Sequence, residues 1–210
     1  MRTRVKICGL TRQEDVDAAV RAGADAIGLV FYSPSPRHIE IELAVELVRH
    51  IPPFVSVVGL FVNASTAEVN AVLDKVAIDL LQFHGDETEE FCISFAKPYI
   101  KAVRVAARED IELADRNYKS ARGLLLDTYV AETPGGTGQS FDWSLIPQQT
   151  TNPVILAGGL NPANVATAIQ QVHPYAVDVS GGVEASKGCK DHDKIIAFIN
   201  EVKGVDTSQV

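Results

Sequence analysis

Short apolar runs alternate along the chain with segments in which apolar residues recur every three or four positions. The runs are rich in Val, Ile and Leu and lack the strict alternation of a half-exposed strand, a pattern typical of parallel strands covered on both faces. The pattern predicts eight strands: Val5–Gly9, Ala26–Phe31, Val55–Val62, Leu80–His84, Ile100–Val105, Gly123–Thr128, Val154–Gly158 and Ala176–Ser180.

The segments between these runs predict amphipathic helices, several with recognisable first turns. Residues Thr11–Glu14 and Ser65–Glu68 each fit a capping box, in which a hydroxyl and a carboxylate accept backbone N–H groups at the start of a helix. Asn161 and Pro162 predict the N-cap and the first residue of a later helix. The helix expected after the sixth strand is the weakest, because Asp142–Pro147 leaves room for little more than a turn or two.

Eight strands in 210 residues give about 26 residues for each unit, the size of one strand–helix step. A doubly wound open sheet uses the same units, but it usually has about five to seven strands and a glycine fingerprint after the first. In this chain the glycine-rich turns follow the seventh and eighth strands instead. We therefore expect an α/β fold, a single (β/α)8 TIM barrel over residues 1–204, followed by a frayed tail over residues 205–210.

The composition is that of an ordinary globular protein, with 46% hydrophobic and 22% charged residues. No run of about 18 apolar residues predicts a membrane span, and no apolar signal region follows the first residues. A net charge of −8 disfavours non-specific binding to nucleic acid. The three cysteines, Cys8, Cys92 and Cys189, are an odd and sparse group that does not suggest a disulfide framework. We expect a cytoplasmic protein that binds neither membranes nor nucleic acid.

Polar residues gather where the predicted strands end, and the active site of a (β/α)8 barrel lies at that end. Two glycine-rich turns stand there: Gly158-Gly159 after the seventh strand and Ser180-Gly181-Gly182 after the eighth. Without Cβ atoms, the backbone N–H groups of such turns can approach an anion closely. A tight connection would explain either turn alone, but the pair at these two strand ends predicts a phosphate site.

Cys8 and Asp127 end the first and sixth predicted strands, so their side chains would face each other across the mouth of a barrel. A carboxylate that closes an apolar strand is costly unless it is paired or functional. A thiol near a helix start can ionise more readily than usual. The two groups are therefore candidates for a general acid and a general base. The alternatives are a buried structural cysteine and an aspartate that caps the following loop.

Arg37 lies in a proline-stiffened loop after the second strand, where a held guanidinium suits bidentate binding of a carboxylate or phosphate. His38 and His84 are further acid–base candidates, although a structural role is the simpler interpretation of each. Cys92 is expected in the core, and Cys189 receives no role. No spacing of Cys, His and Asp is typical of a metal site, and no P-loop or GxGxxG motif opens the first strand–helix unit.

Seven motifs follow one another from the first strand to the last helix: Lys6-Ile7-Cys8-Gly9-Leu10-Thr11, Phe31-Tyr32-Ser33-Pro34-Ser35-Pro36-Arg37, Gln82-Phe83-His84-Gly85-Asp86-Glu87, Leu126-Asp127-Thr128, Gly135-Gly136-Thr137-Gly138 with Phe141-Asp142-Trp143, Ala157-Gly158-Gly159-Leu160, and Asp178-Val179-Ser180-Gly181-Gly182-Val183-Glu184. Each motif alone is weak. Together and in this order, they resemble the phosphoribosylanthranilate isomerase family of tryptophan biosynthesis.

The resemblance implies a (β/α)8 barrel that performs an Amadori rearrangement without cofactor or metal. N-(5-phosphoribosyl)anthranilate would become 1-(2-carboxyphenylamino)-1-deoxyribulose 5-phosphate. By the same resemblance, Asp127 is the general acid that protonates the furanose ring oxygen and opens the ring to a Schiff base. Cys8 is the general base that removes the C2′ proton, giving an enolamine that tautomerises to the ketone.

The resemblance also implies that Arg37 holds the anthranilate carboxylate, that the two glycine turns hold the phosphate and that Asp178 touches the substrate. The expected partner is a small phosphosugar, and we expect a monomer or a homodimer. The sequence departs from the family at Ser180–Gly182, where Ser-Ser-Gly is frequent, and at Lys187–Asp191, where Pro-Gly-x-Lys-Asp is common. The first change keeps the backbone donors, and the second alters the loop before the last helix.

Two other interpretations fit part of the pattern. Another phosphosugar barrel, such as a pentose-phosphate epimerase or a thiamine-phosphate synthase-like transferase, would share the glycine turns. An epimerase of that kind is expected to carry paired carboxylates and metal-binding histidines, which the strand ends of this sequence do not supply. A phosphate-binding module without activity would have lost its acid–base pair, whereas Cys8 and Asp127 are both present.

Overall fold

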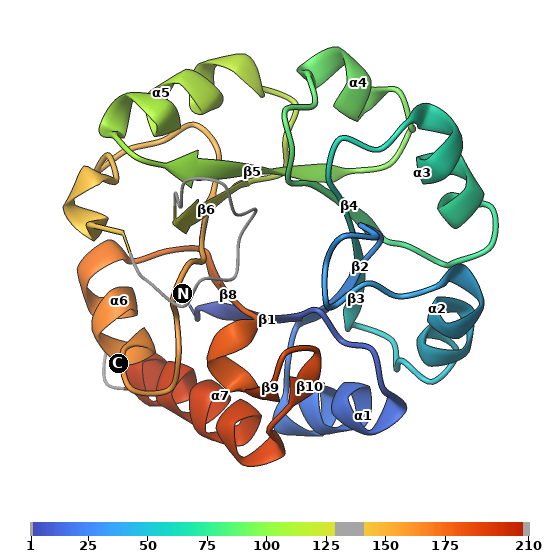
Figure 1. The fold of residues 1–210 in the computed structure, drawn as a ribbon. Coiled ribbons are helices and arrows are strands. Elements are labelled where there is room, and N and C mark those ends of the chain that lie inside the picture. Colours follow the sequence, from blue (N-terminus) through green and yellow to red (C-terminus); the bar gives the residue numbers. More distant parts are fainter. Residues whose placement is uncertain (1, 129–140, 208–210) are drawn as a thin grey trace.

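The computed structural model describes residues 2–128 and 141–207, which form a closed ring of parallel strands surrounded by helices (Figure 1). Each strand pairs with the next in chain order, and pairing of the first strand with the eighth closes the ring. The strands are β1 (Arg4–Cys8), β2 (Ala26–Val30), β3 (Ser56–Phe61), β4 (Leu80–Phe83), β5 (Tyr99–Val105), β6 (Leu124–Thr128), β7 (Val154–Leu156) and β8 (Ala176–Val179). The (β/α)8 barrel predicted from the sequence is confirmed, and the strands lie close to their predicted bounds.

Helices cover the outside of the ring (Figure 1). They are α1 (Gln13–Ala22), α2 (Ile41–Val48), α3 (Thr66–Leu73), α4 (Glu89–Ile93), α5 (Arg108–Asn117), α6 (Val165–Val172) and α7 (His192–Thr207). Between β6 and β7 the described residues form one 3-10 turn, Trp143–Leu145, as the short segment Asp142–Pro147 predicted. Among the described residues, no helix is long and apolar enough to cross a membrane.

The two predicted capping boxes have different outcomes. At α3 the box forms, because Ser65 Oγ accepts from the Glu68 amide while the Glu68 carboxylate accepts from the Ser65 amide. At α1 the predicted box is wrong. The helix begins at Gln13, and the Thr11 hydroxyl instead donates to the Gly188 carbonyl at 2.9 Å.

The start of α6 also differs from its prediction. Asn161 Oδ1 accepts from the Ala163 amide, as a cap would, but these residues form a separate turn and the regular helix begins at Val165. The side-chain amides of Asn161 and Asn164 both donate to the Gly159 carbonyl. These hydrogen bonds attach the turn to the glycine turn that follows β7, and the regular helix starts only after it.

The helix at the end of the chain is longer than predicted. α7 continues to Thr207, so residues 205–207, which the sequence assigned to the tail, are part of the helix. Val205 is buried together with Val202 in the core cluster under the helices. This continued apolar stripe gives the last turn a surface on which to pack. Residues 208–210 lie outside the described part of the chain.

Every second side chain of a strand points into the barrel, and these interior side chains form an apolar layer with a polar layer above it. On β6, Leu125 belongs to an interior apolar cluster, and Asp127 follows two residues later on the same face. On β8, Ala176 and Asp178 repeat this order. The apolar floor thus carries polar groups at the end of the barrel where the strands have their carboxyl ends.

A short hairpin after β8 was not predicted. The 3-10 turn Gly181–Val183 leads into β9 (Glu184–Ser186), which pairs antiparallel with β10 (Cys189–Lys190). Gly188 in the connecting turn has a φ of 81°, a conformation that favours glycine. Figure 1 shows the hairpin beside α1, where the Thr11 contact attaches it.

Candidate active site

A cavity of about 590 Å³ opens at the carboxyl ends of the strands, a volume that suits a small-molecule site. Its lining includes every residue predicted for the site: Cys8, Arg37, Asp127, Gly158, Gly159, Asp178, Ser180, Gly181 and Gly182. The structure therefore brings the predicted catalytic and binding residues around one space. The motif Gly135–Gly138 lies outside the described residues.

A second cavity, of about 750 Å³, lies at the opposite end of the barrel. Arg2, Pro153, His173 and Tyr175 are among its lining residues, and all of them precede or begin the early part of a strand. Its described lining contains no carboxylate or thiol. The two acid–base candidates, Cys8 and Asp127, both line the first cavity, at the end where barrels of this class carry their active sites.

Cys8 lies above a buried ion pair. Lys6, which points into the barrel two residues earlier on β1, places its Nζ 2.9 Å from Asp178 Oδ1. Burial raises the pKa of the Cys8 thiol, and the positive charge of Lys6 opposes that shift. Burial alone would lower the pKa of Lys6, but its interactions with Asp178 and Cys8 together outweigh burial and raise it. Lys6 is thus held as an ammonium beside the thiol.

No role was assigned to Lys6 from the sequence, although its position inside an apolar strand is unusual for a lysine. A lysine inside an apolar strand is unusual, because a buried ammonium is costly without a partner. Its position two residues before Cys8 puts both side chains on the same face of β1. That spacing alone could have placed the lysine at the floor of the site.

Asp127 is held from two sides. Its Oδ1 accepts from the Thr128 amide at 2.8 Å, and its Oδ2 lies 3.2 Å from His84 Nε2. The other ring nitrogen of His84 lies 3.0 Å from Gln82 Nε2. The His84–Asp127 contact is close but not aligned as a hydrogen bond, since Nε2 has no hydrogen-bond partner among the described residues. The structural role favoured for His84 by the sequence therefore includes a contact with the candidate acid.

The two glycine turns touch each other. Gly158 has a φ of 77°, and a Cβ there would collide with Thr128. A Cβ on Gly182 would collide with the Leu160 carbonyl. Both positions therefore require glycine. Within the described part of the chain, the backbone amides of Gly158 and Gly159 have no acceptor, which leaves these donors available to an anion.

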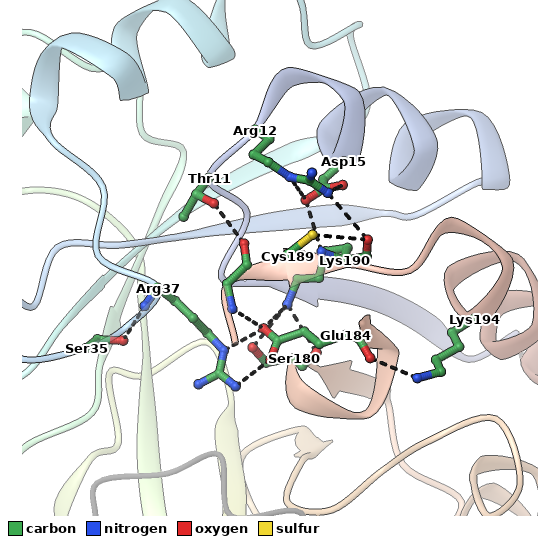
Figure 2. A network of polar contacts seen from close by, with 11 residues as sticks. Thr11, Arg12, Asp15, Ser35, Arg37, Ser180, Glu184, Cys189, Lys190 and Lys194 are labelled. Carbon is green, nitrogen blue, oxygen red and sulfur yellow. Dashed lines mark hydrogen bonds and ion pairs between the residues drawn. The ribbon is translucent and has the colours of Figure 1, made fainter. Parts of the chain in front are cut away.

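Arg37 is held by a carboxylate that the sequence did not single out. Its Nε and Nη2 donate to the two oxygens of Glu184 on β9 at 2.7 and 2.8 Å (Figure 2). Glu184 Oε1 also accepts from Lys190 Nζ at 2.9 Å and from the Gly188 amide at 3.3 Å. Neither Glu184 nor Lys190 was predicted as a site residue, because the hairpin that carries both was not predicted.

The base of the hairpin is fixed by a fully buried carboxylate, Asp15 on α1. It accepts from the Arg12 guanidinium, from the Lys190 amide and from the His192 ring (Figure 2 shows the first two). Burial alone would raise the pKa of Asp15, but the hydrogen bonds from Arg12 and His192 outweigh it and lower the pKa. One carboxylate therefore joins α1, β10 and α7.

The remaining candidates lie away from this chemistry. Cys92 is buried in the core as predicted. Cys189 is half-buried with its Sγ toward the Lys190 carbonyl, and neither it nor His38 belongs to the described lining of the cavity. Among the described residues, no group of three or more His, Cys, Asp and Glu side chains is arranged to hold a metal ion.

The fold and the cavity define the class of protein: a (β/α)8-barrel enzyme with a thiol, a carboxyl group and glycine turns at the barrel mouth. The family model described as N-(5'phosphoribosyl)anthranilate (PRA) isomerase matches residues 5–201. The chain is 62% identical over 201 residues to the N-(5'-phosphoribosyl)anthranilate isomerase of Pseudomonas syringae pv. tomato, covering 96% of this chain and 98% of that protein. This chain belongs to the phosphoribosylanthranilate isomerase family.

Solved structures agree with this assignment. Phosphoribosylanthranilate isomerase from Thermotoga maritima has a TM-score of 0.89 and 47% identity, with 96% of this chain and 99% of that chain covered. A phosphoribosylanthranilate isomerase in complex with reduced 1-(o-carboxyphenylamino)-1-deoxyribulose 5-phosphate has a TM-score of 0.82 and 42% identity, over 96% and 99% of the two chains. A 3-hexulose-6-phosphate synthase from Salmonella typhimurium, 12% identical with a TM-score of 0.70 over 97% and 100% of the two chains, shares the fold alone.

Proposed function

We propose that this chain catalyses the Amadori rearrangement of N-(5-phosphoribosyl)anthranilate to 1-(2-carboxyphenylamino)-1-deoxyribulose 5-phosphate in tryptophan biosynthesis. The observation that carries the proposal is that a thiol, a carboxyl group, an arginine and two glycine turns line one cavity. Relatives of high identity bear the name of this activity, and one solved relative binds the reduced product.

The substrate has an anion at each end, and local groups must hold both because the protein carries a net charge of −8. We assign the phosphate to the turns at Gly158-Gly159 and Ser180–Gly182, whose backbone donors need no formal charge. Arg37 takes the anthranilate carboxylate through its guanidinium. Asp178, which shares the cavity, touches the sugar between these two ends.

The first chemical step belongs to Asp127. As a carboxylic acid it protonates the furanose ring oxygen, the bond from that oxygen to C1′ breaks, and the nitrogen lone pair forms the C1′=N double bond of a Schiff base. The Thr128 amide holds one carboxyl oxygen, and His84 lies against the other. These contacts fix the direction in which the proton is delivered.

Cys8 performs the second step. Its thiolate removes the proton from C2′, and the electron pair of that bond forms C1′=C2′ while the C=N pair returns to nitrogen. The resulting enolamine tautomerises when the C2′ hydroxyl loses its proton and C1′ gains one, which leaves the ketone. Burial raises the pKa of Cys8, so that a small fraction of the thiol is ionised but the thiolate is strongly basic, and the Lys6 ammonium stabilises this thiolate.

The loss of anthranilate fluorescence on mixing substrate with protein tests this function. General acid and general base groups each typically supply about 10²–10⁴-fold, so Cys8→Ala and Asp127→Asn should each raise the barrier by about 3–5 kcal/mol. Cys189→Ala removes a thiol outside the cavity and should keep full activity. Folded Cys8 or Asp127 variants with near-normal turnover would refute the assigned roles. Saturable binding without turnover in the unaltered protein would favour a phosphate-binding module.

We further propose a cytoplasmic setting and action as a monomer or a homodimer, with the barrel as one catalytic domain. The three cysteines are unpaired, in keeping with a reducing compartment. The phosphoribosylanthranilate isomerase of Thermotoga maritima is described as dimeric. Cell fractionation and light scattering of the purified protein test the two statements.

A further inference from the structure

We propose that Glu184 and Lys190 are positioning residues that prepare Arg37 to receive one substrate carboxylate. The proposal rests on the proposed function, in which Arg37 binds the anthranilate end. It concerns the hairpin β9–β10, which lies outside the eight-stranded ring and places both residues beside the cavity.

The contact between Glu184 and Arg37 leaves one edge of the guanidinium open. Two parallel hydrogen bonds, at 2.7 and 2.8 Å, occupy the edge formed by Nε and Nη2 and fix the plane of the group (Figure 2). A guanidinium has five N–H donors, so the edge formed by the two terminal nitrogens remains. Among the described residues nothing accepts from Nη1, and Arg37 lines the cavity. A second carboxylate can bind there without displacing the first.

The charge of Lys190 explains why this arrangement still attracts an anion. Arg37 and Glu184 alone form a pair without net charge, which has little attraction for another carboxylate. The Lys190 side chain is fully buried and its Nζ lies 2.9 Å from Glu184 Oε1, so the three groups together carry one positive charge. One positive charge matches one carboxylate.

The directions of the pKa shifts agree with these charges. Burial would raise the pKa of Glu184, but its hydrogen bonds with Arg37 and the charge of Lys190 outweigh burial and lower it. Burial lowers the pKa of Lys190, and the charge of Glu184 opposes that shift. Glu184 is therefore an anion that supports the charged form of its neighbour.

The same ammonium connects the two anion-binding ends of the site. Lys190 Nζ donates to the Ser180 carbonyl at 3.1 Å and to its hydroxyl at 3.3 Å, in the turn assigned to the phosphate (Figure 2). Glu184 and Lys190 thus set the separation between Arg37 and that turn before substrate arrives. Preorganisation of this kind lowers the cost of binding a ligand held at both ends.

A competing role for Glu184 predicts the opposite result. A carboxylate already paired with Arg37 could act as a competitor that the substrate must displace. Removing its charge would then tighten the binding of a carboxylate ligand. A positioning role predicts weaker binding, because the guanidinium loses its fixed plane. The sign of one affinity change therefore separates the two.

The test compares two ligands on the full-length protein by titration calorimetry. One is reduced 1-(o-carboxyphenylamino)-1-deoxyribulose 5-phosphate, and the other is the same amine prepared from aniline, which lacks the carboxyl group. Glu184→Gln keeps the side-chain shape but loses the charge and one acceptor. We expect it to weaken the binding of the carboxylate ligand about tenfold and that of the aniline ligand less than about twofold. Equal weakening of both ligands, or tighter binding of the carboxylate ligand, would overturn the proposal.

Two further variants complete the experiment. Lys190→Met should also reduce the preference for the carboxylate ligand, because the cluster then has no net charge; if this variant fails to fold, Glu184→Gln still decides. Asp25→Asn is the matched control, since Asp25 pairs with Arg2 at the opposite end of the barrel and its loss should leave the preference unchanged. If the unaltered protein neither converts substrate nor binds either ligand, the proposed function fails. If it does both and Glu184→Gln keeps the full preference, only the positioning role fails.

Discussion

Replacing Lys6 by methionine removes the positive half of the ion pair under Cys8, and the structure allows the cost to be estimated. Lys6 Nζ lies 2.9 Å from Asp178 Oδ1, and the two side chains are only 6% and 9% exposed. Both side chains are therefore largely shielded, and water entering from the cavity would replace the lost partner of the Asp178 carboxylate only in part. Removing one member of a buried pair costs about 3–5 kcal/mol. We expect the free energy of unfolding of Lys6→Met to fall by that amount.

Urea unfolding followed by far-ultraviolet circular dichroism measures this loss. Lys6→Met combined with Asp178→Leu should recover most of it, because replacing both members of a buried pair by apolar groups is often neutral or stabilising. A loss below about 1 kcal/mol in the single variant, the range of exposed pairs, would show that the pair is solvated and refute the reasoning.

The same substitution has a second consequence at the thiol. The charged groups around Cys8 are Lys6 and Asp178 in the barrel, Lys190 on the hairpin and Arg37 on the loop after β2. Burial raises the pKa of Cys8 above its ordinary value of 9.0 while Lys6 lowers it, so removing Lys6 should raise it further. The rate at which iodoacetamide alkylates Cys8, measured by mass spectrometry, should increase with pH. The midpoint of this increase should lie above pH 9.0, and at a still higher pH in Lys6→Met. An unshifted midpoint in the variant would contradict the assigned contact.

Other substitutions test single features of the molecule. Asp15→Asn should lower the free energy of unfolding by about 3 kcal/mol at pH 7; because the folded state lowers the pKa of Asp15, this difference should shrink as the pH falls below 3.8 in urea titrations. His84→Asn should reduce kcat about ten- to a hundredfold with little change in KM, since it touches the candidate acid, and steady-state kinetics would show whether KM moves instead. Gly182→Ala should collide with the Leu160 carbonyl, raise KM and cost about 1–3 kcal/mol of stability. Gly204→Ala is its control, because a Cβ at Gly204 meets nothing within 4 Å; this variant should neither raise KM nor lower the stability.

The barrel could be predicted because its signals are local and repeated. Each strand is an apolar run that can be recognised without its neighbours, and the late glycine turns favour a closed ring over an open sheet. Helix starts are less predictable, as Thr11 and Ser65 show. Both begin sequences that fit a capping box, but the Thr11 hydroxyl binds Gly188, which lies 177 positions later. No local pattern contains that contact.

The residues of the candidate site also differ in how far local sequence signals could predict them. Cys8 and Asp127 could be placed at the cavity from the sequence because they end strands, and the topology of a barrel brings strand ends together. Glu184 and Lys190 depend on a hairpin of five strand residues with an irregular register, which has no periodicity to detect. Lys6 was detectable in principle, since its spacing from Cys8 places both on one face of β1.

The little-exposed charged groups around the cavity fit the proposal that this acidic protein binds a substrate with two anionic groups. Lys6, Arg37 and Lys190 are three cations with little exposure, and Asp178 and Glu184 are two carboxylates paired with them. These five little-exposed groups together carry one positive charge. Three unpaired cations would be too costly to bury, and a fully neutral cluster would not attract the carboxylate. In the proposed function the phosphate is left to uncharged backbone donors at the glycine turns, which can hold an anion without a further buried cation.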